Sequence, residues 1–256
     1  MVKWLAALLL LAACAPPAAA QESAATETDS DPTRPVFFSV RPEFYRIAGD
    51  VERYVFISRF DAAALRGTSI LGARSGVIMR FELPFSHGRA GDGRAFGLGD
   101  AYGQFFLLPY ATRRFVVVAG SGFILPTATD RLLGSGKWIA APVTAPVWRL
   151  SRGLFFVKVQ NFVSFAGAED RPDVNYLLIT PTLIKGVGRD WWMLADTETK
   201  SNWKAGGRTG VKSGFQVGRR VSRSLGVWVK PEAWWGANPD GEWNLKFGFV
   251  WYQRRR

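Results

Sequence analysis

Cysteine and histidine are almost absent from this chain of 256 residues, which has one of each, Cys14 and His87. One cysteine cannot build a disulfide framework, and no spacing of histidines, cysteines and carboxylates suggests a zinc site. A serine-histidine pair is also disfavoured. The neighbouring Ser86 would point away from His87 in an extended strand, and the glycines nearby predict a loop there. We therefore expect no enzyme chemistry, no metal and no cofactor.

The chain also lacks long apolar runs. After the N-terminus no stretch reaches the length of about 18 apolar residues that a membrane helix needs. This excludes a helical membrane protein, although 48% of the residues are hydrophobic and the mean hydropathy is +0.00. A membrane β-barrel would escape such a test, because half of its strand residues face a polar lumen.

The N-terminal residues 1–20 are typical of an export signal, with a positive residue before a short apolar segment. Two alternatives remain open for its processing. Small residues favour cleavage after Ala20, whereas the four residues that end at Cys14 resemble a lipobox and would make Cys14 a lipidated N-terminus. The polar residues 21–35 are expected to be a disordered lead-in. Residues 36–256 are then expected to form one barrel domain.

The net charge of +12 and the isoelectric point of about 10.3 raise the question of a nucleic-acid partner. The lysines and arginines are dispersed along alternating segments, without a basic helix or zinc-binding spacing, so we expect no nucleic acid. Their expected contacts are a lumen, outer-membrane lipid headgroups and lipopolysaccharide.

Alternation with a period of two is strongest from residue 203 to the C-terminus. In the first of three runs one face carries Trp203, Val211, Phe215 and Val217, and the other carries Lys204, Arg208, Lys212 and Gln216. Such alternation places the two sets on opposite faces of a sheet. The runs are roughly 10–14 residues long with tryptophan near both ends, which is typical of a tilted strand that crosses a bilayer.

The same pattern and the turn signals predict about twelve strands in an all-β, antiparallel transmembrane barrel with no separate soluble domain. The expected strands cover 34–46, 49–60, 67–84, 95–110, 112–126, 136–150, 152–166, 173–186, 188–200, 203–219, 222–236 and 241–253. Connections alternate between short and long, which predicts short periplasmic turns, longer outer loops and both termini in the periplasm. Ten strands are the alternative, because this alternation is weak near the first two.

The polar positions of these strands are our candidates for the lumen lining. They are Arg80, Glu82, Lys158, Asp196, Glu198, Lys204, Arg208, Lys212, Lys230, Glu232 and Lys246. Cations outnumber acids on the last three strands, so we expect a preference for anions that falls when Lys204, Arg208 and Lys212 become glutamine. Tryptophans near strand ends are the candidates for the two interfacial girdles. They are Trp138, Trp148, Trp191, Trp203, Trp235, Trp243 and Trp251.

Several short motifs occur in a shared order between about residue 67 and residue 252. They are Val77-Ile78-Met79-Arg80-Phe81-Glu82-Leu83-Pro84, Gly97-Leu98-Gly99-Asp100, Leu125-Pro126-Thr127, Leu133-Gly134-Ser135-Gly136, Trp191-Trp192 with Asp196-Thr197-Glu198, Gly214-Phe215-Gln216-Val217-Gly218-Arg219 and Glu242-Trp243-Asn244-Leu245-Lys246-Phe247. With them the chain resembles the outer-membrane barrels named for the MetA pathway of phenol degradation. The resemblance implies a barrel that the outer-membrane assembly machinery of a Gram-negative cell inserts, and that passes small, aromatic or hydrophobic compounds. The chain departs from the pattern of this family at its C-terminus, where three arginines follow Gln253.

We therefore expect a narrow channel or uptake porin for small solutes, since open aqueous pores typically need about 16 strands. Two alternatives remain. A structural or adhesive surface barrel would have a plugged lumen and loops that bind a partner. A lipid-modifying barrel enzyme is disfavoured by the single histidine.

Overall fold

The computed structural model describes residues 30–33, 36–47, 51–64, 77–90, 93–236 and 241–252. The expected export signal, with Cys14 and the cleavage position after Ala20, lies outside these residues. So do most of the lead-in and the C-terminal arginines.

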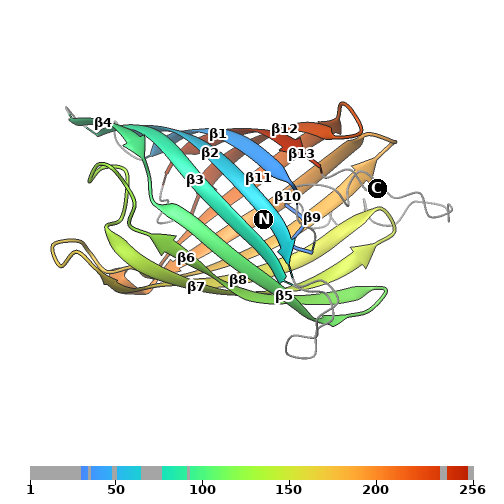
Figure 1. Ribbon diagram of the computed structural model, residues 1–256, viewed down its shortest axis with the longest axis horizontal. Helices are drawn as coiled ribbons and strands as arrows, with labels where there is room; N and C mark the ends of the chain where they lie inside the picture. The colour runs from blue at the N-terminus through green and yellow to red at the C-terminus, as the bar shows by residue number, and fades with distance from the viewer. Residues whose placement is uncertain are drawn as a thin grey trace.

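The described residues form a barrel of antiparallel strands, drawn in Figure 1. The strands are β1 (Phe38–Ile47), β2 (Val51–Ala64), β3 (Val77–Ala90), β4 (Gly93–Leu98), β5 (Ala101–Ala111), β6 (Phe115–Leu125), β7 (Lys137–Leu150), β8 (Gly153–Gly167), β9 (Asn175–Val187), β10 (Trp191–Asn202), β11 (Arg208–Arg220), β12 (Leu225–Trp235) and β13 (Trp243–Trp251). Twelve of them close the ring, with β1 next to β13, β2 next to β3 and β3 next to β5, while β4 pairs only with β3. The predicted all-β barrel of about twelve strands is confirmed.

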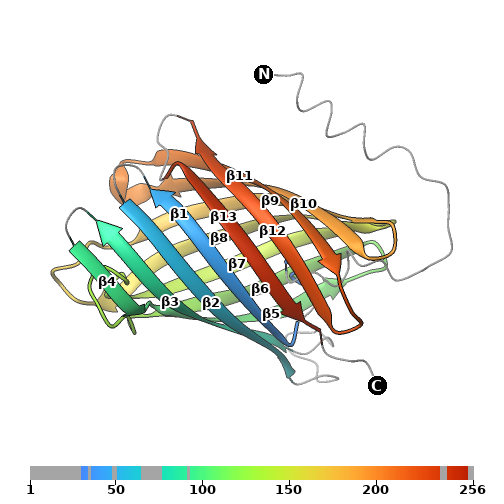
Figure 2. The ribbon, with the colours of Figure 1, turned by 90° about the horizontal axis from the view of Figure 1, so that it is seen from above.

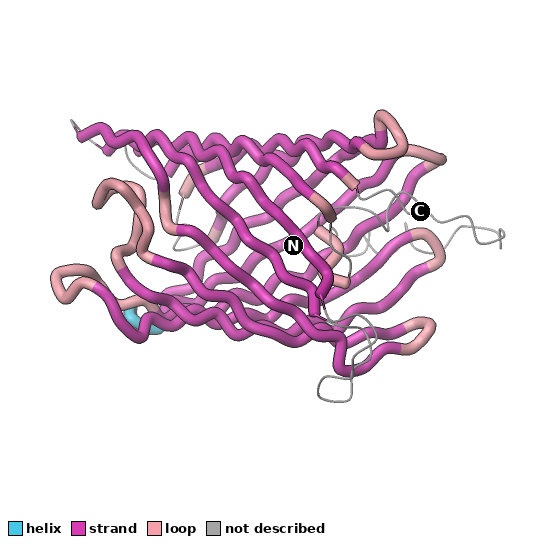
Figure 3. The backbone as a smooth tube through the Cα atoms, viewed as in Figure 1, coloured by secondary structure: helices cyan, strands magenta, loops and turns pink. Residues whose placement is uncertain are grey.

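The barrel has two distinct ends. Phe38 at the start of β1 pairs with Trp251 at the end of β13, so both termini of the barrel lie at one end, which we call the terminus end. The described turns there are two to four residues long, at 112–114, 151–152, 188–190 and 221–224. At the opposite end, which we call the loop end, the described connections 126–136, 168–174 and 203–207 are five to eleven residues long (Figure 3).

The strand β4 corrects one prediction. The region 85–95 was expected to be a long loop, but β3 continues to Ala90 and forms a hairpin with β4. The hairpin extends past the ring at the loop end (Figure 2). Aromatic side chains stabilise it, because the rings of Phe85 and Phe96 meet edge to face at 4.7 Å. His87 therefore lies on a strand rather than in a loop, with its ring 6.2 Å from Tyr54.

A second correction concerns residues 203–219, which were expected to be one strand. Residues Trp203–Ala205 form the short 3₁₀ helix η2, and Gly206 and Gly207 follow with φ angles of 68° and 75°. These left-handed angles suit glycine and reverse the chain. Therefore β10 ends at Asn202, whose side chain accepts a hydrogen bond from the Lys204 backbone N–H at 3.1 Å, and β11 begins only at Arg208.

The outer face of the barrel is apolar and its inner face is packed or polar. In β13, Phe247, Phe249 and Trp251 are exposed, whereas the intervening Val250 is fully buried inside. Large exposed hydrophobic side chains recur in the same way on the other strands. Such a continuous apolar exterior suits contact with lipid. The described part of the chain has no helix that is long and apolar enough to cross a membrane.

Candidate functional site

The lumen contains a cavity of about 340 Å³, and every strand of the closed ring contributes a side chain to its lining. Strand alternation brings this about, because every second side chain points inward. Seven cationic and four anionic side chains line the cavity. The cations are Arg41, Arg59, Arg80, Lys158, Lys212, Lys230 and Lys246, and the acids are Glu82, Asp196, Glu198 and Glu232.

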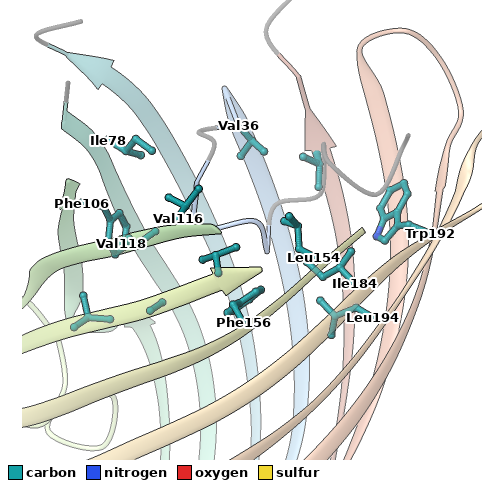
Figure 4. Close-up of a cluster of buried hydrophobic side chains, with 14 of the residues drawn as sticks. Val36, Ile78, Phe106, Val116, Val118, Leu154, Phe156, Ile184, Trp192 and Leu194 are labelled. Carbon is teal, nitrogen blue, oxygen red and sulfur yellow. The ribbon is translucent and has the colours of Figure 1, made fainter. Parts of the chain in front are cut away.

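An apolar layer lines the interior of the barrel at the terminus end. Its buried side chains come from strands all around the ring and point to the interior (Figure 4). Val36, which precedes β1 and is 4% exposed, belongs to it. Trp192 and Trp228 are its largest members, and each lies against a glycine. A Cβ atom on Gly218 would stand 2.1 Å from Cε2 of Trp192, and one on Gly248 2.0 Å from Cε2 of Trp228, so these indoles need glycine opposite them.

Part of the expected lead-in also reaches the lumen. Residues 30–33 form a turn in which Oδ1 of Asp31 accepts hydrogen bonds from the backbone N–H and the hydroxyl of Thr33, at 2.8 and 2.7 Å. Asp31 is only 1% exposed, and Ser30 and Pro32 line the cavity. The N-terminal segment thus occupies lumen space.

Carboxylates on β10 and β12 pair with lysines on β11, β12 and β13. We call this side of the lumen, β10 to β13 together with β1 to β3, the charge-paired wall. Glu232 is at its centre, with Lys230, Lys246 and Lys212 at 2.7, 3.0 and 3.8 Å from its carboxylate oxygens. Lys212 also bonds to Glu198 at 3.1 Å. Lys230 and Lys246 likewise have second carboxylate partners, Asp196 and Glu43, so the lysines and acids of this wall form one network in which removing a member would leave buried charge uncompensated.

The charge-paired wall continues across β1, β2 and β3 with arginines. Asp61 is buried between Arg59 and Arg80, at 2.6 and 3.2 Å. Arg41 bonds to the buried Glu43. Our sequence prediction missed Arg41, Glu43, Arg59 and Asp61. The i, i+2 spacing of opposite charges, at 41 and 43 and again at 59 and 61, was the available signal.

The opposite side of the lumen, β5 to β9, has few charges, and we call it the apolar wall. Towards the loop end it carries Ile139 and Phe162, both buried, with Tyr102, Tyr176 and Leu178 packed against them. The rings of Phe162 and Tyr176 stack at 4.7 Å.

The structure places nine of the eleven predicted lumen residues at the cavity. They are Arg80, Glu82, Lys158, Asp196, Glu198, Lys212, Lys230, Glu232 and Lys246. The placement of Lys204 inside a strand was wrong, whereas Arg208 does lie in one. Lys204 lies in η2 at the loop end, and Arg208 is exposed where β11 begins. Neither lines the cavity: the turn at Gly206 and Gly207 takes Lys204 out of the strand, and Arg208 is at the exposed end of β11.

All seven tryptophans predicted for the girdles are exposed. Trp138, Trp203, Trp235 and Trp243 lie at the loop end, and Trp148, Trp191 and Trp251 at the terminus end. Trp203 differs from the others because it lies in η2 rather than in a strand.

At the loop end, Asp173 joins two loops. Its carboxylate accepts hydrogen bonds from the ammonium groups of Lys137 and Lys204, at 3.1 and 3.2 Å. These bonds stabilise the charged form and hold the pKa of Asp173 below its ordinary value. The Asp173 carboxylate is thus paired with two lysines. Within the described ranges no cluster of three or more histidines, cysteines or carboxylates could hold a metal ion.

Comparisons with known proteins identify the fold. The COG4313 outer membrane channel from Pseudomonas putida F1 matches with a TM-score of 0.68 and 12% identity, over 92% of this chain and 99% of that one. The KdgM porin matches with a TM-score of 0.57 and 7% identity, over 84% and 99%. Outer membrane phospholipase A from Escherichia coli matches with a TM-score of 0.53 and 12% identity, over 91% and 98%.

No family model matches the chain. No curated protein sequence matches it either. At the identities of the solved structures the likeness extends to the fold alone. By fold, the protein is an outer-membrane β-barrel.

Proposed function

We propose that the protein is a narrow outer-membrane channel that takes up small solutes, aromatic, hydrophobic or anionic in character, as in the family named for the MetA pathway. The observation that carries this proposal is the lumen cavity, lined from all twelve strands of the ring, inside a barrel with an apolar exterior. A solute can enter such a cavity from water while lipid covers the outside.

In this proposal the terminus end faces the periplasm and the loop end faces outward. Among the described connections, those at the terminus end are shorter than those at the loop end, which supports this orientation. The exposed tryptophans at both ends are then the interfacial girdles, and outer-membrane lipid and lipopolysaccharide surround the barrel. The residues before β1 would follow a cleaved or lipidated export signal.

Passage through this barrel is gated. The apolar layer, with Trp192, Trp228 and Val36, narrows the lumen at the terminus end, and a ring of twelve strands is smaller than the roughly 16 strands of an open aqueous pore. A solute that reaches the cavity from the loop end must therefore displace part of this layer to leave. This favours selective uptake over general diffusion.

An enzymatic role is disfavoured, although phospholipase A shares the fold. His87 is exposed on β3 with aromatic neighbours Tyr54 and Phe96, and Ser86 beside it is buried on the other face of the strand. A nucleophile and its base must lie within hydrogen-bonding reach. We infer that this barrel transports rather than cleaves.

The proposal is tested by uptake of radiolabelled benzoate and phenol into proteoliposomes that contain the refolded chain. We expect uptake above that of protein-free liposomes. A heat-dependent shift in gel mobility shows that the barrel is folded in the same sample. A folded barrel without uptake of either solute would favour the structural or adhesive alternative.

A further inference from the structure

One cation of the lumen differs from the others in its surroundings. Among the seven that line the cavity, six form a salt bridge with a carboxylate. Lys158, in the middle of β8 on the apolar wall, has no carboxylate within salt-bridge distance in the part of the chain that the structure describes. Glu198 faces the lumen two strands away, but its carboxylate bonds to Lys212. The half-buried ammonium of Lys158 therefore offers donors to the cavity.

Two hydroxyl groups near Lys158 also have a proton to donate. Thr180 is the partner of Lys158 on β9, and its Oγ1 is buried without a hydrogen-bond partner among the described residues. The oxygen of Tyr102 accepts hydrogen bonds from the amides of Gln104 and Gln160, at 2.8 and 2.6 Å. Both of its lone pairs are occupied, so its own O–H remains available. The ammonium of Lys158 and the hydroxyl groups of Thr180 and Tyr102 thus face one cavity, and each has a proton that no acceptor among the described residues takes up.

The surroundings of these donors are aromatic and aliphatic. On β8, Phe156 and Phe162 also point inward and line the cavity, on either side of Lys158 along the strand. Leu178 on β9 lines it as well. An isolated inorganic anion would gain nothing from this apolar surface, whereas a planar ring would bury its faces there. The site therefore suits a molecule with both an anionic group and a ring.

We propose that Lys158, Thr180 and Tyr102 bind the carboxylate of a small aromatic acid, whose ring lies against Phe162 and Leu178. This inference rests on the proposed function, because it names the class of solute that the lumen receives. The carboxylate supplies the acceptors that the three donors lack. A neutral phenol would satisfy the hydroxyl groups but not the ammonium, and an aromatic amine would be repelled by it.

The test is calorimetric titration of the refolded full-length mature barrel in detergent with benzoate, benzyl alcohol and benzylamine. We expect benzoate to bind about tenfold or more tightly than benzyl alcohol, since a hydrogen bond between charged groups is stronger than a neutral one. Benzylamine should not bind. Binding is measured without any transport, so the site can be tested separately from the channel.

Substitutions of the proposed donors test whether benzoate binds at this site. Lys158→Met should weaken benzoate binding about tenfold or more, and Thr180→Val and Tyr102→Phe should each weaken it several-fold. Lys158→Arg should retain binding because it keeps the charge. Lys185→Met is the matched control, since Lys185 points outward from the neighbouring β9 by strand alternation. Should Lys158→Met fail to fold, Thr180→Val decides, because it preserves the side-chain shape.

Two results would overturn the inference: no benzoate binding by the folded wild-type barrel, or equal weakening by Lys158→Met and Lys185→Met. Solute uptake without benzoate binding would reject this site and leave the channel in place. Benzoate binding without uptake of any solute would reject the channel and leave the site.

Discussion

The two walls of the lumen use their polar groups differently. On the charge-paired wall every lysine and arginine at the cavity meets a carboxylate, and Glu232 alone serves three lysines. On the apolar wall Lys158 faces the cavity among aromatic side chains with no such partner in the described structure. The charges of the charge-paired wall are therefore compensated within the protein, whereas the apolar wall presents a cation that a solute can pair with. A count of lumen lysines predicts neither property by itself.

Breaking the charge-paired wall should have the largest effect. Glu232→Gln leaves Lys212, Lys230 and Lys246 with less compensating charge at a carboxylate whose side chain is 2% exposed. We expect a loss of roughly 3–5 kcal/mol in the free energy of unfolding. Urea titration followed by the heat-dependent gel shift measures it. Glu242→Gln is the control, because its bond to Arg46 is exposed and should contribute less than about 1 kcal/mol. Equal unfolding midpoints for the two variants would show that the wall is not stabilised by its ion pairs.

Opening the apolar layer should have the next largest effect. Trp192 is fully buried in this layer, whereas the adjacent Trp191 is exposed on the outside. Trp192→Ala should remove about 3–5 kcal/mol of stability and raise the conductance in planar bilayers several-fold, because the cavity it leaves connects the lumen to the terminus end. Trp191→Ala is the matched control and should leave the conductance unchanged. A rise in both variants would place the barrier elsewhere.

Ion selectivity should depend on the unpaired lysine of the apolar wall and not on the cations at the loop end. Lys158→Gln should reduce any anion preference, seen as a shift of the reversal potential in asymmetric salt, because its charge has no carboxylate beside it. Lys204→Gln combined with Arg208→Gln should shift it little, since both residues lie outside the cavity. If the double variant has the larger effect, selectivity is set at the loop end.

The smallest effect is expected from the hydrogen bonds of Asp173 to Lys137 and Lys204, which we call the Asp173 clamp. The pKa of Asp173 is lowered in the folded protein, so its stabilising bonds are fully present above the ordinary value of 3.8 and are lost as the pH falls below it. Asp173→Asn should lower the protection of amides in 168–174 against hydrogen exchange at pH 7, and acidification below pH 3.8 should lower the protection factors of the wild type, which are corrected for the slower intrinsic exchange in acid. Glu169→Gln in the same loop should have no effect. Unchanged exchange in Asp173→Asn would show that the loop does not depend on the clamp.

The period-two pattern predicted the strands and their faces well, because alternation depends only on local sequence. It could not predict which charges pair. That Glu198 meets Lys212 follows from the register of β10 and β11, which only the folded barrel shows. The register of β8 and β9 likewise places Lys158 opposite Thr180 rather than opposite a carboxylate. The error at Lys204 had a local signal that was overlooked, namely the pair Gly206-Gly207. The inward position of Trp192 beside the outward Trp191 follows from alternation, but the glycine that receives it comes from the neighbouring strand.

The most direct test of the account is the conductance of the refolded protein in a planar bilayer, recorded for the wild type and for Trp192→Ala. We predict a small, steady conductance for the wild type that benzoate reduces, and a larger conductance for Trp192→Ala. No conductance from either protein, when both show the heat-dependent gel shift of a folded barrel, would contradict the claim that the lumen is a channel.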